Sequence, residues 1–162
     1  MARELIIKNV KDALAAGSNI IESAENEVVW LLPANYLAYS FQLGIPKKSK
    51  MLIEKGGRVR GITKISGVYI DPVRRVRIDP VRKLLDSGEE LRHIGQFPGV
   101  FMLVGDNKES ISSMDINAEN LTPDDPTVAF WTDNKAQAEF LIATFETVWN
   151  EAVDAKKRLR EL

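Results

Sequence analysis

The side chain best suited to chemistry near neutral pH is His93, the single histidine of the chain. An imidazole exchanges its proton near pH 6.5 and can bind anionic or polar groups. Arg92 precedes it at the end of a predicted strand, and Thr63 and Lys64 lie at the end of another. Because parallel strands gather binding groups at their carboxyl ends, we predict a ligand-binding site made of His93, Arg92, Thr63 and Lys64. The alternatives are a histidine hydrogen-bonded to nearby backbone and an ordinary exit from strand to loop.

The residue counts exclude several classes of chemistry. The chain has no cysteine and one histidine. Disulfides, thiolate catalysis, cysteine-type zinc sites and sites that need two histidines are therefore excluded, and we expect neither a metal nor a cofactor. The net charge of −1 provides no general attraction to nucleic acid or to an anionic membrane.

Length and hydropathy favour a single domain. The chain has 162 residues, an ordinary size for one domain. Val28 to Leu32 is among the longest unbroken apolar runs, far short of the roughly 20 residues of a membrane span. The charged N-terminus lacks the apolar segment of a secretory signal. We therefore expect one cytoplasmic domain over residues 1–162, with no membrane contact.

Charge is distributed unevenly along the sequence. From Lys55 to Lys83 there are nine basic residues and two acidic ones, and from Asp106 to Asp125 there are six acidic residues and one lysine. The basic block could bind nucleic acid, and the two blocks together could form a self-complementary dimer surface. No aromatic residues are interleaved with Arg74, Arg75, Arg77 and Arg82, which weakens the nucleic-acid interpretation. The remaining alternative is a set of solvated helix faces and loops.

Hydrophobic periodicity predicts alternating helices and strands. A period of three to four residues predicts an N-terminal helix within 1–24 and a C-terminal helix over 133–162. Further helices are expected at 37–43, from Pro46 and from Asp79-Pro80. Strands are expected at 27–32, 58–65, 89–94, 99–105, 109–114 and 127–131, with 99–114 forming a hairpin. Early alternation implies parallel pairing and the hairpin adds antiparallel strands, so we predict an α/β fold with one mixed sheet and helices on both faces.

A short duplication precedes the third predicted strand. The sequence Ile-Asp-Pro-Val-Arg occurs at 70–74 and again at 78–82. Two Asp-Pro helix starts do not fit into one straight helix, because proline lacks the N–H that the helix interior needs. We therefore expect a helix that starts at Pro80, preceded either by a short helix or turn at Pro72 or by a loop.

The predicted last helix is unusually long. Its apolar residues are spaced three and four apart in turn, as in a coiled coil. They are Ala138, Leu141, Phe145, Val148, Ala152, Ala155, Leu159 and Leu162. One small sheet cannot cover a helix of about 43 Å at 1.5 Å per residue. We therefore predict a homodimer in which the terminal helices pair, against the alternative of a monomer whose helix frays past Ala152.

The order of these segments resembles half of a phospholipase D-like domain. It is most similar to the sensory versions found in archaeal and bacterial regulators and histidine kinases, and to the effector domain of TrmB-type regulators. The stretches that carry the resemblance are Glu27–Trp30, Gly57–Thr63, Glu90–His93, Gly99–Met114, Phe130–Thr132 and Phe145–Ala152. The resemblance implies a phospholipase D-like fold.

Enzymes of that superfamily carry the motif His-x-Lys-x4-Asp on the first strand of the hairpin, with the histidine as nucleophile. On this chain the motif falls on Gly99, Phe101 and Asp106. Neither glycine nor phenylalanine can replace the nucleophile or its lysine, and a tight turn accounts for Asp106. The resemblance therefore implies a non-catalytic domain that responds to an unidentified small molecule and acts through a downstream kinase or DNA-binding module. The alternatives are a nucleic-acid-binding module that uses the 55–83 block and an enzyme with an unrecognised site.

Overall fold

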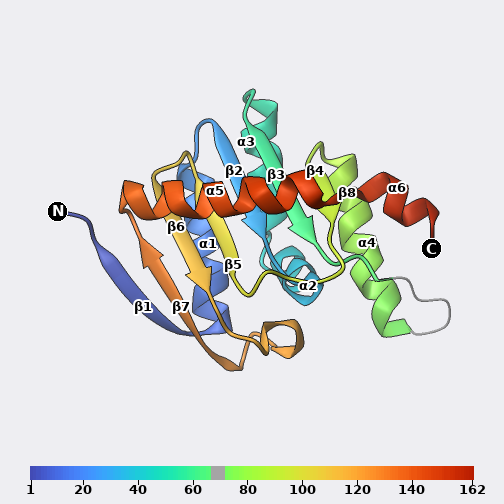
Figure 1. Cartoon of the computed structure of the whole chain (residues 1–162), viewed down its shortest axis with the longest axis horizontal. Helices are drawn as coiled ribbons and strands as arrows, with labels where there is room; N and C mark the ends of the chain where they lie inside the picture. Colours follow the sequence, from blue (N-terminus) through green and yellow to red (C-terminus); the bar gives the residue numbers. More distant parts are fainter. Residues whose placement is uncertain (67–71) are drawn as a thin grey trace.

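The computed structural model describes the backbone of residues 1–66 and 72–162 and the side chains of 1–66 and 79–162. Among these residues, eight strands form one sheet in the order β1-β7-β6-β5-β2-β3-β4-β8 (Figure 1). β2 (Glu27–Leu31), β3 (Arg58–Thr63) and β4 (Glu90–His93) are parallel. Every other pairing in the sheet is antiparallel. The predicted α/β fold with one mixed sheet is confirmed.

The antiparallel half of the sheet begins with the predicted hairpin. β5 (Phe101–Gly105) pairs with β2 on one side and with β6 (Glu109–Ser113) on the other. Asp106 and Asn107 join the two strands with φ angles of 52° and 57°. Short polar residues tolerate this left-handed conformation, and it matches the twist of a two-residue hairpin turn. β7 (Pro126–Thr132) continues the sheet after a 3-10 turn at Ala118–Asn120.

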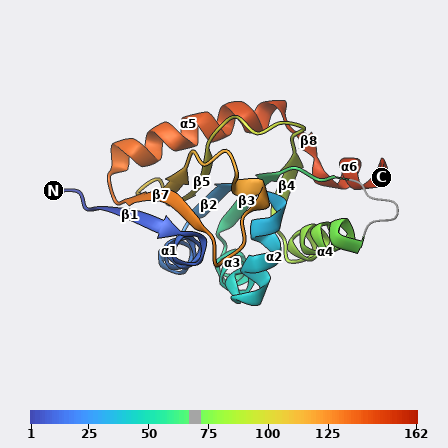
Figure 2. The ribbon, with the colours of Figure 1, turned by 90° about the horizontal axis from the view of Figure 1, so that it is seen from below.

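Helices cover both faces of the sheet (Figure 2). One face carries α1 (Val10–Ser23), α2 (Ala34–Gln42), α3 (Ile45–Glu54) and α4 (Pro72–Asp86), and α5 (Lys135–Glu151) crosses the other. Successive residues of a strand point to opposite faces. In β2, Val28 and Trp30 therefore join the core under α1–α4, while Val29 and Leu31 join the core under α5.

The first predicted helix is in part a strand. Residues Glu4–Asn9 form β1, an edge strand that pairs with β7, and the helix begins only at Val10. Asn9 ends the strand and caps the helix, because its side-chain oxygen accepts the Asp12 N–H at 2.8 Å. The prediction of one helix over this segment was wrong, since Ile6 belongs to the sheet and not to the apolar stripe of α1.

The helix expected to start at Pro80 starts earlier. α4 begins at Pro72 and continues through Pro80, which occupies an interior position without an N–H to donate. Val81 and Leu84 are almost completely buried in the core, and this packing offsets the missing hydrogen bond. The first copy of the Ile-Asp-Pro-Val-Arg duplication begins outside the described residues.

The predicted last helix is interrupted. α5 ends at Glu151, Ala152 is extended, and Val153–Asp154 form β8, which pairs with β4. Asp154 then caps the short helix α6 (Ala155–Arg160) by accepting the Lys157 N–H at 3.2 Å. Ala155 is fully buried, and Leu159 and Leu162 pack against the same core. The continuous helix was therefore a wrong prediction, because this apolar seam covers the domain's own sheet. The homodimer stays a prediction, without the exposed seam that motivated it.

No helix within the described residues is both long enough and apolar enough to span a bilayer.

Candidate functional site

The predicted site residues lie at the carboxyl ends of β3 and β4. Thr63 and His93 are direct partners in the parallel register, so their side chains share one face of the sheet. His93 is half-buried, and its Nδ1 accepts the backbone N–H of Ile65 at 2.8 Å. The ring proton of the neutral imidazole therefore lies on Nε2, which remains the donor available to a ligand.

The surroundings of His93 keep the ring uncharged. Burial lowers the pKa of His93, and the positive charges of Arg158 and Lys64 lower it further. Arg158, on α6, also donates from Nε to the carbonyl of Ile65 at 3.1 Å. The C-terminal helix and the exit of β3 are thus connected next to His93.

Thr63 and Lys64 complete the β3 side of this position. The Thr63 side chain is fully buried, and its hydroxyl oxygen has no hydrogen-bond partner among the described residues. Lys64 is half-buried, close enough to His93 for its charge to affect the imidazole. Thr63, Lys64 and His93 are therefore brought together by the structure.

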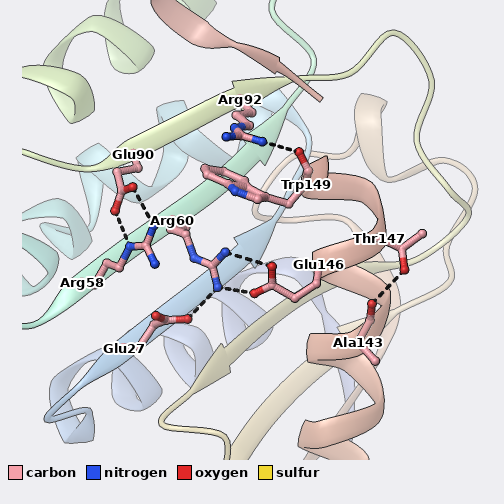
Figure 3. Close-up of polar contacts among 9 residues, drawn as sticks. All are labelled: Glu27, Arg58, Arg60, Glu90, Arg92, Ala143, Glu146, Thr147 and Trp149. Carbon is pink, nitrogen blue, oxygen red and sulfur yellow. Dashed lines mark hydrogen bonds and ion pairs between the residues drawn. The ribbon is translucent and has the colours of Figure 1, made fainter. Parts of the chain in front are cut away.

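Arg92 lies on the opposite face of the sheet, under α5 (Figure 3). Its guanidinium is 4.2 Å from the ring centroid of Trp149, and it donates to the Trp149 carbonyl at 2.7 Å. These contacts hold the C-terminal end of α5 against the sheet, at the point where the helix stops. The geometry separates Arg92 from the other three predicted site residues.

An ion cluster under α5, with a buried arginine and two partly exposed carboxylates, was not predicted from the sequence (Figure 3). The Arg60 guanidinium binds both carboxylate oxygens of Glu146, and its Nη2 lies 2.9 Å from Glu27. It also lies 5.1 Å from the ring centroid of Phe145 and 5.3 Å from that of Trp149. Burial alone would lower the pKa of Arg60, but the hydrogen bonds to Glu146 and Glu27 outweigh it and raise the pKa. The cluster keeps Arg60 charged and fastens α5 to β2 and β3.

Several members of the basic 55–83 block are engaged inside the domain. Arg58 forms a two-point ion pair with Glu90, with distances of 2.5 and 2.8 Å. Arg60 is neutralised by two carboxylates, and the Lys83 ammonium lies 5.5 Å from the ring centroid of Phe41. The side chains of Arg74, Arg75 and Arg77 lie outside the described residues. The described part of the block is therefore partly compensated by internal partners.

The three residues on which the expected catalytic motif falls lie before, at the start of and after β5. Gly99 precedes the strand in an exposed loop with φ +91°, and the buried Phe101 ring packs edge-on against Phe97 with centroids 4.9 Å apart. Asp106 lies beyond the far end of the strand, which at five residues spans about 17 Å. At these two positions the head of β5 carries neither a histidine nor a lysine, since Gly99 has no side chain and Phe101 is apolar.

Asp106 organises a turn. Its carboxylate accepts the backbone N–H groups of Glu25, Asn26 and Glu27 at 2.7, 2.8 and 2.9 Å. Burial would raise the pKa of Asp106, but these three N–H donors more than compensate and lower it. The aspartate therefore fixes the connection between α1 and β2, in addition to its predicted place in the hairpin turn.

A second feature missed by the sequence analysis connects β2 to β4. The Trp30 indole crosses β3 at Gly61 and donates from Nε1 to a Glu89 oxygen at 3.0 Å. A Cβ atom at Gly61 would lie 2.1 Å from two of the indole carbons, so only glycine allows this crossing. Burial raises the pKa of Glu89 to about 7, although the Trp30 N–H opposes the shift. The available signal was a glycine inside a strand, which marks a close approach.

Within the described residues, no three His, Cys, Asp or Glu side chains gather in a way that could hold a metal ion.

Comparison with known proteins identifies the fold. No protein-family model and no curated protein sequence matches the chain. The solved structure of TrmBL2, an archaeal chromatin protein with a novel mode of DNA binding, matches with a TM-score of 0.69 and 15% identity. That match covers 94% of this chain and 54% of TrmBL2, so the chain spans about half of that protein.

Two bacterial structures match over nearly their whole length. Nuc from Salmonella typhimurium, a phospholipase D family member, has a TM-score of 0.68 and 17% identity, over 95% of this chain and 98% of Nuc. NucT from Helicobacter pylori has a TM-score of 0.67 and 13% identity, over 95% of this chain and 99% of NucT. The chain therefore has a phospholipase D-like fold, and at these identities the likeness establishes the fold alone.

Proposed function

We propose that this chain is a non-catalytic, ligand-responsive domain of a signalling or transcription-regulating protein. The observation that carries the proposal is the head of β5, where Gly99 and Phe101 occupy the positions of the superfamily's nucleophile and lysine. His93 does not replace the missing histidine, because it lies on β4 and its Nδ1 is occupied by the Ile65 N–H. A phosphodiester bound near Phe101 would find no histidine or lysine at these two positions.

The proposed ligand contacts are at the strand ends. Nε2 of His93 is a donor, Lys64 is a nearby cation, and Thr63, with its buried hydroxyl, is the register partner of His93. Together they favour a polar or anionic small molecule. Arg92 would act on such a ligand indirectly, through the end of α5, and it stays in the proposed site in that role.

Hydrogen bonds connect the proposed ligand contacts at His93 to the C-terminal helix α6. Ile65 donates its N–H to His93 and accepts from Arg158 of α6 with its carbonyl. A ligand that moved the imidazole would therefore change the support of the C-terminal helix. TrmBL2 contains this fold in a chain about twice as long, which supports a role as one part of a larger regulator.

The proposal is tested by phosphodiester turnover. Purified protein is assayed on bis-p-nitrophenyl phosphate and on phosphatidylcholine, with His93→Ala as the matched variant. We expect background rates for both proteins, because the head of β5 has no nucleophile. Turnover by the wild type that is lost in His93→Ala would refute the proposal and support the alternative of an enzyme with an unrecognised site.

Nucleic-acid binding is the second candidate function. The structural similarity to a DNA-binding chromatin protein favours it, and the internal pairing of Arg58 and Arg60 weakens it. Binding through the 55–83 block would show a salt dependence of several released counterions. A fluorescence titration of duplex DNA at two salt concentrations measures that slope, and we expect no measurable binding at physiological salt. The homodimer and the cytoplasmic location remain predictions from the sequence.

A further inference from the structure

An apolar cavity lies between the sheet and the helices α1, α2 and α3. Its volume is about 80 Å³. Its walls include Leu14 and Ile21 of α1, Tyr36 of α2, Ile45 of α3 and Trp30 of β2. None of the predicted site residues at the strand ends contributes to the wall. The cavity is therefore a separate place in the fold.

Glu89 is the single charged side chain in the described wall of this cavity. Its side chain is 96% buried, since 4% of the residue is exposed. Trp30 is the one hydrogen-bond donor to its carboxyl group among the described residues. Among the described side chains, no lysine, arginine or histidine lines the cavity, so none of them supplies a counter-charge to the ionised carboxylate. Burying an ionised carboxylate in an apolar interior costs free energy unless a cation or further hydrogen-bond donors interact with it.

The other polar and aromatic groups of the wall suit a cation. Ser49, buried on α3, adds a hydroxyl oxygen that can accept a hydrogen bond. Trp30, Tyr36 and Phe101 contribute aromatic rings, whose faces attract organic cations. An apolar cavity of about 150 Å³ holds benzene, so about 80 Å³ accommodates three or four non-hydrogen atoms.

We propose that this cavity binds a short-chain primary ammonium ion, with the ammonium group on Glu89 and the aliphatic body among the apolar residues of α1–α3. The ammonium would supply the missing counter-charge, and the aliphatic carbons would fill the dry part of the space. A neutral alcohol of the same shape would fill the space without neutralising Glu89, and a carboxylate would be repelled. Binding of the ammonium ion does not depend on the proposed function. Only the idea that this binding has a regulatory effect rests on the proposed ligand-responsive role.

The Trp30 indole provides a direct readout. Its Nε1–H contacts Glu89, so its ¹H–¹⁵N resonance reports on the carboxyl group. The Trp131 Nε1–H, which donates to Glu109 at 2.9 Å, serves as a control in the same spectrum. The Trp30 resonance is assigned with Trp30→Phe. The protein is titrated with n-propylamine and with 1-propanol at pH 8, where n-propylamine is protonated and Glu89 is ionised.

We expect n-propylammonium to shift the Trp30 resonance saturably, at least tenfold more tightly than 1-propanol, and to leave Trp131 in place. In Glu89→Gln, whose amide oxygen can still accept from Trp30, the two compounds should bind equally weakly. Glu90→Gln, which removes the adjacent carboxylate, should keep the preference for the amine. Between pH 8 and pH 6 the affinity should fall about tenfold as Glu89 protonates, while Tyr36, with a pKa of about 12, does not titrate in this range.

Equal binding of amine and alcohol by the wild type, an unshifted Trp30 resonance, or an amine preference that survives in Glu89→Gln would overturn the inference. These outcomes are separate from failure of the proposed function. If a polar metabolite binds in a His93-dependent manner while amines do not, the ligand-responsive function stands and the ammonium site is refuted. If the protein turns over phosphodiesters while n-propylamine binds as described, the proposed function fails and the ammonium site stands.

Discussion

Replacing Glu89 by Gln should change the pH dependence of stability in a defined direction. The folded protein raises the pKa of this carboxyl from an ordinary value of 4.5 to about 7, because the group is buried. Between those two values the folded chain binds a proton that the unfolded chain has released. Glu89 therefore contributes its full stability below about pH 4.5 and loses it as the pH rises through about 7.

The size of the effect follows from the width of this pH window. A difference of one bound proton changes the free energy of unfolding by about 1.4 kcal/mol per pH unit. Over the window from 4.5 to about 7, the wild type should lose about 3 kcal/mol relative to Glu89→Gln. The glutamine has no charge to bury and keeps an oxygen that accepts the Trp30 N–H. The stability of Glu89→Gln therefore lacks this pH-dependent contribution.

The assay is urea unfolding of both proteins at half-unit intervals from pH 4.5 to 8.5. The quantity that matters is the difference between the two proteins, because His93, whose pKa is lowered from 6.5, also titrates in this range and contributes the same slope to both. Glu90→Gln is the matched control. The Arg58 ion pair lowers the pKa of Glu90, so its contribution to stability changes only below about pH 4.5. The difference between the wild type and Glu90→Gln should therefore stay nearly constant over the assay range. A wild-type minus Glu89→Gln difference that stays constant with pH would refute the reasoning.

Three further variants test other parts of the structure. Gly61→Ala should lower the free energy of unfolding by about 3 kcal/mol, because the added Cβ would collide with the Trp30 indole, and urea unfolding measures the loss. Asp106→Ala should cost about 2 kcal/mol by the same assay, since three backbone N–H groups lose their acceptor, and Asp106→Asn should recover part of it. Leu159→Asp should destabilise the isolated domain, because Leu159 packs on its own core. Sedimentation equilibrium of the wild type tests the predicted homodimer, and a monomer at high micromolar concentration would contradict it.

The hairpin and the mixed sheet could be predicted because their signals are local. The turn pair Asp106-Asn107 adopts the left-handed conformation that such residues tolerate, and an apolar run precedes it. The predicted strand at 99–105 is also observed, as β5, which begins at Phe101, so Gly99 precedes the strand and Asp106 follows it. Local turn chemistry was sufficient for this part of the chain.

The two ends of the chain were mispredicted for reasons that the sequence does not show. β1 is an edge strand whose Leu5 and Ile6 are each 60% exposed, so it lacks the buried–exposed alternation that identifies a strand. The break after α5 has no glycine or proline. It is determined by the pairing of Val153 with His93 on β4, a contact between residues 60 positions apart. In both segments the apolar residues are spaced as in a helix, but pairing with a distant strand, β7 or β4, makes part of the segment a strand.

The polar features of the interior depend on contacts between distant segments. Arg60 meets carboxylates 33 and 86 positions away, and Trp30 reaches Glu89 across 59 positions. Neither pairing has a spacing that can be recognised along the chain. At the predicted site, the shared register of Thr63 and His93 followed from the parallel strands, whereas the strand alternation that turns Arg92 to the other face was overlooked.

The central claim, ligand binding without catalysis, is tested most directly by thermal unfolding of the wild type with a panel of small polar and anionic metabolites. The account predicts that at least one compound raises the unfolding temperature saturably, as binding to the folded state alone requires. It also predicts that the compound is recovered unchanged, and that His93→Ala folds but loses the shift. A panel without any saturable shift, or a stabilising compound that the wild type converts to product, would contradict the account.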